Sequence, residues 1–302
     1  MDVLNYLRRA EITLKRWQRL RILAPRGIGS ADDVSACYLK GSEVKLAISG
    51  KGGVGKTTLS AMLTAGLALE GYHVIALDAD PDANLGSALG LSDEEGVTPL
   101  AEMRDLIKER TGAANAYGGY FKLNPKVDDI PEAYARVIGN VRLLTLGGIS
   151  GGGDGCICPA SALLKALLMH LVLGRDDHVI MDMEAGIEHL GRATAQSMDA
   201  LIVVVNPAAW SIQTAQRVRA LAGDIKLARV FAVANRITDD DQLDRIQEQL
   251  GDMPLIGHLP VDNRLVDGII RITPDGEMTP SAALDDHLTS LKALRKALED
   301  RL

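Results

Sequence analysis

The stretch ISGKGGVGKTTLSAML, Ile48 to Leu63, decides the fold. Within it, Gly50 to Thr57 matches G-x-x-x-x-G-K-[ST], a loop whose backbone N–H groups turn inward around phosphates. A β-branched run precedes the loop and a helical pattern follows it, as phosphate binding at a helix N-terminus requires. We expect Lys56 to reach the β- and γ-phosphates of ATP and the Thr57 hydroxyl to hold Mg²⁺. The predicted nucleotide-binding residues are Gly50, Lys51, Gly52, Gly53, Val54, Gly55, Lys56, Thr57 and Thr58.

Short apolar runs alternate with helical patterns from Val44 onward. Predicted strands lie at 44–49, 73–78, 141–146, 178–183, 200–205, 229–235 and 254–259, and predicted helices include 57–70, 159–174, 210–223 and a last one carrying Leu284 to Leu298. Strands that are apolar on both faces, with helices between them, indicate a parallel sheet covered on both sides. We therefore expect one α/β P-loop NTPase domain over 44–302, with a mostly parallel sheet of about seven strands.

Composition excludes several classes of function. The chain has 302 residues, 47% of them hydrophobic, which is enough for a sizeable core. Its formal net charge of −7 argues against general affinity for nucleic acid. No apolar run approaches the roughly 20 residues of a membrane span. Three cysteines are too few for a disulfide framework, so we expect a cytoplasmic protein.

Residues 1–43 differ from the rest and form a predicted N-terminal extension. Apolar side chains recur at helical spacing from Val3 to Trp17, and basic side chains from Arg8 to Arg19 fall on the opposite side. This pattern indicates a basic amphipathic helix. We favour a solvated or dimer-packing extension, or a natural start further downstream, over attachment to a membrane surface. A cleaved signal peptide is disfavoured because no apolar region follows the arginines.

The segment GKGGVGKTT resembles the deviant Walker A motif of the MinD/ParA, arsenical-pump and nitrogenase iron protein class of ATPases. The resemblance implies that Lys51 reaches across a dimer to the partner's nucleotide. A cation supplied in trans when two subunits close can neutralise charge that develops during phosphoryl transfer. The alternative is an exposed loop lysine without that role.

Two further segments carry the remaining predicted nucleotide-site residues. The run HVIMDM brings Asp182 to a strand end, where it can hold magnesium through water. DADPDANL resembles switch I of the same class, which implies that Asp80 orients the attacking water and that Asp78 and Asn84 lie near the metal and phosphates. The same residues also suit an Asx turn and a helix cap. MEAGIEHLGR stands where switch II would follow, with Glu184 and Gly186. The resemblance further implies base contacts from Asn206 and Asn235.

Cys156 and Cys158 follow a glycine-rich loop and directly precede a predicted helix. A helix N-terminus favours the thiolate, the form that binds soft metals. One such pair cannot complete a tetrahedral site, whereas two copies at a two-fold axis supply four thiolates. Two small buried residues at a strand-to-helix turn are the alternative. Ligand softness permits Ni²⁺ or Zn²⁺.

Together, DADPDANL, GCICP and DMEAGIEHLGR look like the CooC family, ATP-dependent accessory proteins that help insert nickel into carbon monoxide dehydrogenase. The resemblance implies a homodimer with Ni²⁺ or Zn²⁺ between paired CxC motifs. It also implies apo carbon monoxide dehydrogenase, or a related nickel enzyme, as partner. A positional ATPase of the MinD/ParA kind, cycling on a membrane or nucleoid, is the alternative and needs neither cysteine. An iron–sulfur donor would require a further cysteine soon after Asp182, where the sequence has none.

Overall fold

The computed structural model describes residues 43–92, 97–113, 120–147, 159–173, 177–185, 198–227, 229–273 and 277–302. These residues belong to one compact unit, Glu43–Leu302. The predicted N-terminal helix, Cys156, Cys158 and Gly186 lie outside the described ranges.

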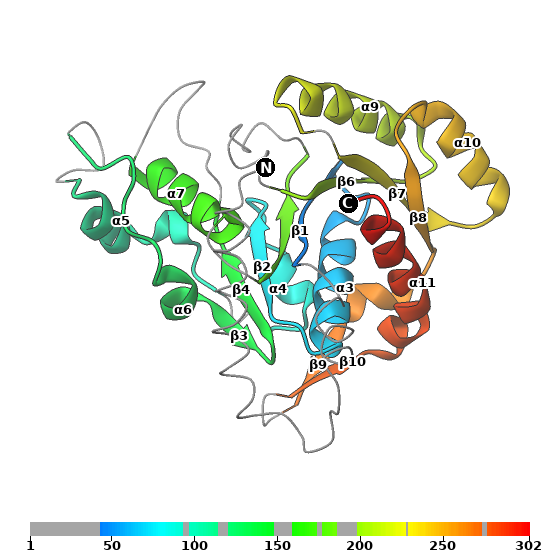
Figure 1. Ribbon diagram of the computed structural model, residues 1–302. Coiled ribbons are helices and arrows are strands. Elements are labelled where there is room, and N and C mark those ends of the chain that lie inside the picture. Colours follow the sequence, from blue (N-terminus) through cyan, green and yellow to red (C-terminus); the bar gives the residue numbers. More distant parts are fainter. Residues whose placement is uncertain are drawn as a thin grey trace, which may run out of the picture. The chain divides into compact units, whose positions relative to one another are not determined.

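A parallel sheet organises this unit (Figure 1). Within the described residues it has eight strands in the order β3-β4-β2-β5-β1-β6-β7-β8. All neighbours pair in parallel except β3 with β4. The strands are β1 Lys45–Gly50, β2 Val74–Ala79, β3 Arg136–Ile138, β4 Val141–Thr145, β5 His178–Met183, β6 Ala200–Val205, β7 Val230–Ile237 and β8 Leu255–Pro260.

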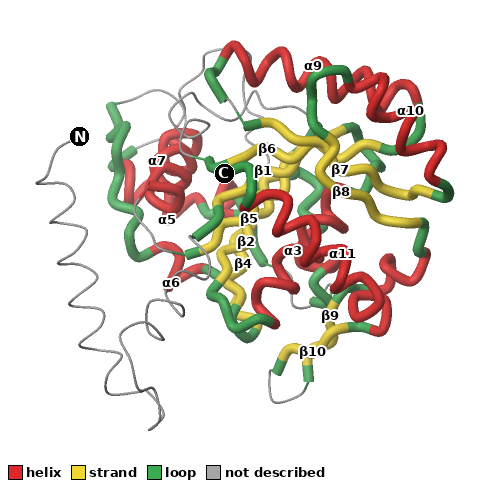
Figure 2. Tube along the Cα trace, turned by 45° about the vertical axis from the view of Figure 1, so that its right-hand side comes forward, coloured by secondary structure: helices red, strands yellow, loops and turns green. Residues whose placement is uncertain are grey.

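Helices cover both faces of the sheet (Figure 2). One apolar core contains residues of α5 Arg104–Thr111, α7 Pro159–Leu173, α9 Ala209–Asp224 and α10 Asp240–Leu250. The other contains residues of α3 Lys56–Leu69, α4 Leu85–Ala88 and α11 Ala282–Glu299. The inner strands are buried throughout, so their side chains alternate between the two cores. Shorter elements are α6 Ile130–Tyr134 and the 3-10 helices η2 Leu100–Glu102 and η3 Asn263–Asp267.

The predicted architecture is confirmed. All seven predicted strands are present in the main sheet, and the named helical segments correspond to α3, α7, α9 and α11. The structure adds β3, which turns back on β4 through Gly139, at φ +53°. It also adds a separate antiparallel pair, β9 Ile270–Ile272 and β10 Met278–Pro280.

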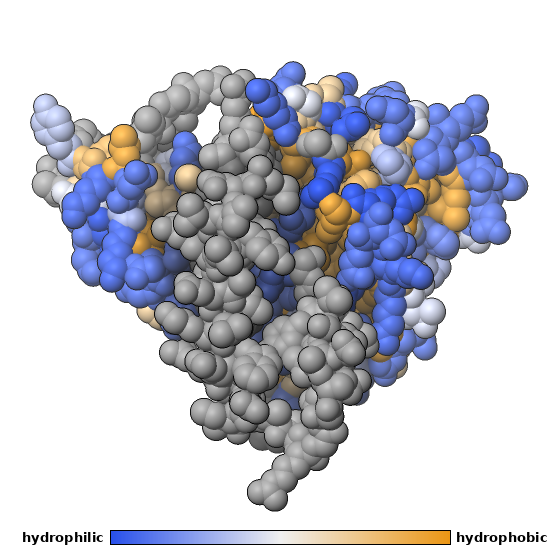
Figure 3. Space-filling view, in the orientation of Figure 1, coloured by the Kyte–Doolittle hydropathy of each residue, from blue (hydrophilic) through white to orange (hydrophobic). Residues whose placement is uncertain are grey.

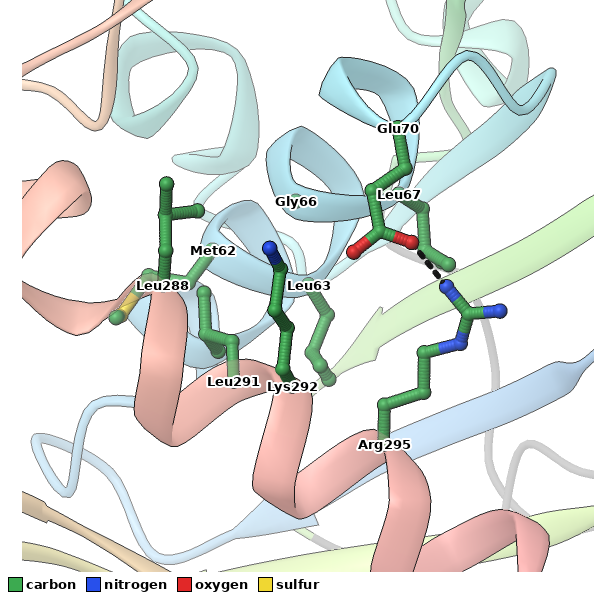
Figure 4. Close-up of a pocket in the computed structure, with 9 residues that line it drawn as sticks. All are labelled: Met62, Leu63, Gly66, Leu67, Glu70, Leu288, Leu291, Lys292 and Arg295. Carbon is green, nitrogen blue, oxygen red and sulfur yellow. Dashed lines mark hydrogen bonds and ion pairs between the residues drawn. The ribbon is translucent and has the colours of Figure 1, made fainter.

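The helix α3 packs beside α11, and a small cavity of about 30 Å³ remains between them (Figure 4). Leu291 of α11 faces Gly66 of α3 across it, and Leu288 lies beside Met62. Arg295 closes one side through an ion pair with Glu70, and its guanidinium lies 4.9 Å from the Tyr72 ring centroid. This contact fixes the helix that follows the phosphate loop against the C-terminal helix.

Hydrophilic residues gather over α10, whose sequence is DDQLDRIQEQL (Figure 3). Its Asp239 side chain accepts a hydrogen bond from the Gln242 backbone N–H at 3.0 Å and so caps the helix. No helix in the part of the chain that the structure describes is long and apolar enough to cross a bilayer.

Candidate functional site

The glycine-rich loop joins the carboxyl end of β1 to the first turn of α3. β1 lies between β5 and β6, at the point where the strand order reverses and parallel sheets bind ligands beyond their carboxyl ends. Gly50, Gly53 and Gly55 have φ values of +143°, +78° and +97°, which L side chains rarely adopt. A Cβ at Gly50 would lie 2.5 Å from the Val204 carbonyl oxygen on β6. The loop therefore requires glycine both for its turns and for its close approach to the sheet.

The two lysines of the loop occupy different environments. Lys56 is the first residue of α3 and is only 7% exposed, whereas Lys51 is half-buried near the start of the loop. Burial raises the pKa of Asp182, and the Lys56 charge opposes that rise, so Lys56 acts on this carboxylate. This difference agrees with the predicted division of roles, in which Lys56 serves its own nucleotide and Lys51 remains available to a second subunit. The structure describes one chain, so the second role stays a prediction.

Asp182 and Asp78 stand side by side on β5 and β2. Both are fully buried. Asp182 Oδ1 accepts a hydrogen bond from the Ser60 hydroxyl at 3.0 Å, while its buried Oδ2 has no hydrogen-bond partner among the described residues. Such an orphaned oxygen beside a second carboxylate suits a cation or its bound water. The residues present therefore fit the predicted magnesium site, with Thr57 also directed at Asp182.

Burial perturbs the acidity of both carboxyl groups. Burial, with a smaller contribution from the neighbouring Asp182 charge, raises the pKa of Asp78 to about 7, against hydrogen bonds from the Leu85 and Asp80 backbone. Burial likewise raises the pKa of Asp182 to about 6, with hydrogen bonds from Thr57 and Ser60 acting in the opposite direction. A bound divalent cation would favour the ionised form of each.

The DADPDANL segment places its residues at the same edge of the sheet. Asp80 follows β2, and its backbone N–H donates a hydrogen bond of 3.3 Å to Asp78 Oδ1. Asp80 Oδ1 accepts a hydrogen bond from the Asp82 backbone N–H at 3.1 Å, which is the Asx turn considered above. Asn84 stands at the N-cap of α4, but its side chain makes no capping hydrogen bond. Asp78 performs that task, accepting from the Leu85 backbone N–H at 2.8 Å.

The remaining predicted residues are also at this edge. Asn206 follows β6, and its Oδ1 accepts from the Ala208 backbone N–H at 3.3 Å before α9 begins. Asn235 lies near the end of β7, buried against the loop. Glu184 follows β5 and is exposed, with its backbone oxygen 3.4 Å from the Ser49 hydroxyl. Their roles at a nucleotide stay predictions.

Sequence reasoning missed Ser60. It lies one turn after Lys56 on α3 and is fully buried, and its hydroxyl lies 3.0 Å from the Lys56 carbonyl oxygen, which competes with Asp182 for the single hydroxyl proton. Spacing of four residues from the loop lysine was the available signal, because residues i and i+4 share one face of a helix.

No group of three His, Cys, Asp or Glu side chains within the described ranges has the arrangement of a metal-binding cluster. The predicted thiolate site is not among those ranges, since Cys156 and Cys158 lie outside them.

Comparison with known proteins agrees with this geometry. Residues 45–273 match the CobQ/CobB/MinD/ParA nucleotide binding domain family. The carbon monoxide dehydrogenase accessory protein CooC of Rhodospirillum rubrum is 41% identical over 224 residues, 74% of this chain and 85% of that protein. The chain belongs to the CooC family. A further relative of this CooC-family chain is an uncharacterised ATP-binding protein of Methanocaldococcus jannaschii, 44% identical over 74% of the chain and 87% of that protein.

Solved structures show the same fold. MinD in the MinC:MinD cell division complex of Aquifex aeolicus has a TM-score of 0.55 at 23% identity, covering 85% of this CooC-family chain and 94% of that one. A plasmid partition protein of Borrelia burgdorferi bound to AMPPNP has a TM-score of 0.57 at 16% identity, covering 87% and 100%. Family, fold and phosphate loop together show an ATP-binding domain of the P-loop ATPase class.

Proposed function

We propose that this protein is an ATP-dependent maturation factor that delivers nickel to carbon monoxide dehydrogenase or a related nickel enzyme. The observation that carries the proposal is 41% identity to a protein named as a carbon monoxide dehydrogenase accessory protein, over 85% of its length. The phosphate loop with two lysines and the Cys156/Cys158 pair support it from this chain's own residues. In a dimer, Lys51 could act on the partner's nucleotide, and two cysteine pairs would supply four thiolates.

In the proposed cycle, two copies close around ATP. Lys56 holds the phosphates of its own subunit, and Lys51 reaches the nucleotide of the other. Thr57, Asp78 and Asp182 would hold Mg²⁺, which neutralises charge on the β- and γ-phosphates when bound. Asp80 orients the water whose oxygen bonds to the γ-phosphorus while the bond from that phosphorus to the bridging oxygen breaks. ADP and phosphate leave, and the dimer reopens.

The cargo ion is held between the two subunits by four thiolates, Cys156 and Cys158 from each. Nickel is the proposed cargo, and zinc satisfies the same ligands. ATP can change the affinity for the ion only if it stabilises one dimer state over another. A reducing cytoplasm keeps such thiols available.

Metal content distinguishes this proposal from its alternative. We would measure nickel and zinc per dimer, with and without ATP, for the wild type, for Cys156→Ser/Cys158→Ser, and for Cys37→Ser as the matched cysteine control. We expect about one ion per dimer in the wild type and in Cys37→Ser, and loss of that ion in the double variant. If the double variant keeps the wild-type stoichiometry and affinity, the delivery proposal fails.

The second candidate is a positional ATPase, favoured by the fold that the chain shares with MinD and ParA proteins. It predicts that the double cysteine variant hydrolyses ATP and dimerises as the wild type does, with no metal bound by either. Identity to the MinD of Synechocystis is 27%, well below the 41% identity to CooC, and so we rank this candidate second.

A further inference from the structure

Asn235 makes a contact that its predicted role at the base does not require. It lies near the end of β7 and is 6% exposed. Its Nδ2 donates a hydrogen bond of 2.8 Å to the backbone oxygen of Val54, 181 residues earlier in the chain. Val54 is within the phosphate loop, between two of the glycines that shape it. A side chain of β7 therefore holds the backbone of the phosphate loop, which follows β1.

The orientation of the Asn235 amide is determined by its two neighbours. Oδ1 accepts the Arg236 backbone N–H at 2.9 Å, and Nδ2 faces the Val54 carbonyl. Rotating the amide by 180° would place donor against donor and acceptor against acceptor. Arg236 adopts φ +61°, which is uncommon for a residue with a Cβ. The residue next to this amide, Arg236, therefore has an unfavourable φ angle.

Gly55 makes room for the same side chain. A Cβ at Gly55 would lie 2.1 Å from Asn235 Nδ2, far inside any permitted contact. Gly55 also has φ +97° and immediately precedes Lys56, the first residue of α3. The last glycine of the loop and the amide on β7 therefore fit against each other, at the point where the helix N-terminus must face a phosphate.

We propose that Asn235 is a positioning residue that holds the phosphate loop in its binding conformation before any nucleotide arrives. β7 is paired on both sides, with β6 and β8, so it is a rigid anchor for the amide. A loop that is already ordered loses less conformational entropy when phosphates bind. The amide has two N–H groups, and the bond to Val54 uses one, so a base contact remains compatible. The inference rests on nucleotide binding and not on metal delivery.

A ligand without a base separates the two roles of Asn235. We would titrate Mg²⁺–tripolyphosphate and Mg²⁺–ATP into the wild type and Asn235→Ala. If Asn235 holds the loop, both affinities fall together by about tenfold, the usual effect of one buried hydrogen bond. If it serves the base alone, ATP affinity falls and tripolyphosphate affinity is unchanged, and that result overturns the inference. Asn206→Ala is the matched control, since Asn206 has a predicted base contact and no contact with Val54.

Hydrogen exchange in the protein without ligand provides the second readout. We expect the backbone amides of residues 51–56 to exchange faster in Asn235→Ala, with exchange in the central strands unchanged. Unchanged exchange in the loop would also overturn the inference. Should the alanine variant fail to fold, Asn235→Asp keeps the volume and, when ionised, cannot donate to Val54. A wild type that binds neither ligand would instead contradict nucleotide binding itself.

Discussion

Asp262 lies in the turn after β8 and accepts hydrogen bonds from two directions. Arg264 donates to it through its backbone N–H, at 2.9 Å, and through its guanidinium. His287 of α11 has Nε2 3.2 Å from Oδ2 of the same carboxylate. These hydrogen bonds, those from Arg264 first, hold the pKa of Asp262 well below its usual range. One carboxylate thereby joins η3 to the C-terminal helix.

We expect Asp262→Asn to lower the free energy of unfolding at pH 7. Because the pKa of Asp262 is lower in the folded than in the unfolded chain, its ionisation stabilises the fold above the unfolded value of about 3.9. That contribution is lost as the pH falls further, so the difference between variant and wild type should narrow on acidification. Urea unfolding from pH 7 to pH 3 measures it. Asp286→Asn is the control, because Asp286 binds the same Arg264 but its side chain is 62% exposed. A pH-independent difference would contradict the assignment.

At the level of single residues, the sequence predicted which residues belong to the site better than it predicted the contacts that their side chains make. The phosphate-loop motif located Lys56 and Thr57, the HVIMDM run located Asp182, and the structure places the three residues at one edge of the sheet. It could not show that Asn235 turns its amide to Val54, because a contact between residues 181 positions apart has no local pattern. Ser60 was missed for a related reason: its spacing from Lys56 places both residues on one face of α3 but does not identify Asp182, 122 residues away, as the partner of its hydroxyl.

The helix α3 carries a glycine, Gly66, in its last turn, where no left-handed backbone angle requires glycine. Gly66 faces the cavity between α3 and α11, and a Cβ there would lie 3.7 Å from Leu291 Cδ1, an ordinary van der Waals contact. Glycine in a helix interior is less favourable than alanine by roughly 0.5–1 kcal/mol. Replacing this glycine by alanine should therefore stabilise the fold.

We expect Gly66→Ala to raise the free energy of unfolding by about 1 kcal/mol, through helix propensity and a new contact with Leu291. Denaturant unfolding measures the change. Gly223→Ala in α9 is the matched comparison, because a Cβ there would meet open space, so any gain reflects propensity alone. A destabilised Gly66→Ala would show that the space between α3 and α11 is too small for a methyl group.

Among the strands, periodicity predicted the long ones and missed the short ones. β5 and β6 are apolar on both faces and six residues long, so a buried strand was the natural interpretation. β3 has three residues, two of them exposed, and depends on its pairing with β4. β9 and β10 likewise depend on their antiparallel pairing with each other. Such elements are stabilised by tertiary pairing, which a local pattern does not carry.

At the scale of the whole molecule, the two lysines of the loop differ in whether their proposed roles involve one chain or two. Lys56 is buried within its own chain, whereas Lys51 is partly exposed and free of the helix. The proposed catalytic role of Lys51 involves a second copy of the chain. The proposed thiolate site requires the same assembly, because one chain supplies two of its four ligands.

We expect Lys51→Ala to retain ATP binding while losing hydrolysis by about 10³-fold or more, the scale of a cation supplied in trans. It should also lose the dimer tightening that ATP produces. Lys56→Ala should weaken ATP binding itself. Calorimetry, phosphate release and sedimentation separate these effects, and Lys108→Ala on the exposed side of α5 serves as the control. Unchanged turnover in Lys51→Ala would remove the role across the dimer.

The position of β1 also determines when the nucleotide site can form during synthesis. β1 is made early but pairs only with β5 and β6. The bond from the Val44 backbone N–H to His178 Nδ1, at 3.1 Å, spans 134 residues. Closing so long a loop costs conformational entropy before the contact can repay it. The strands on both sides of β1 are therefore complete only when the chain has been made as far as Val205, the last residue of β6.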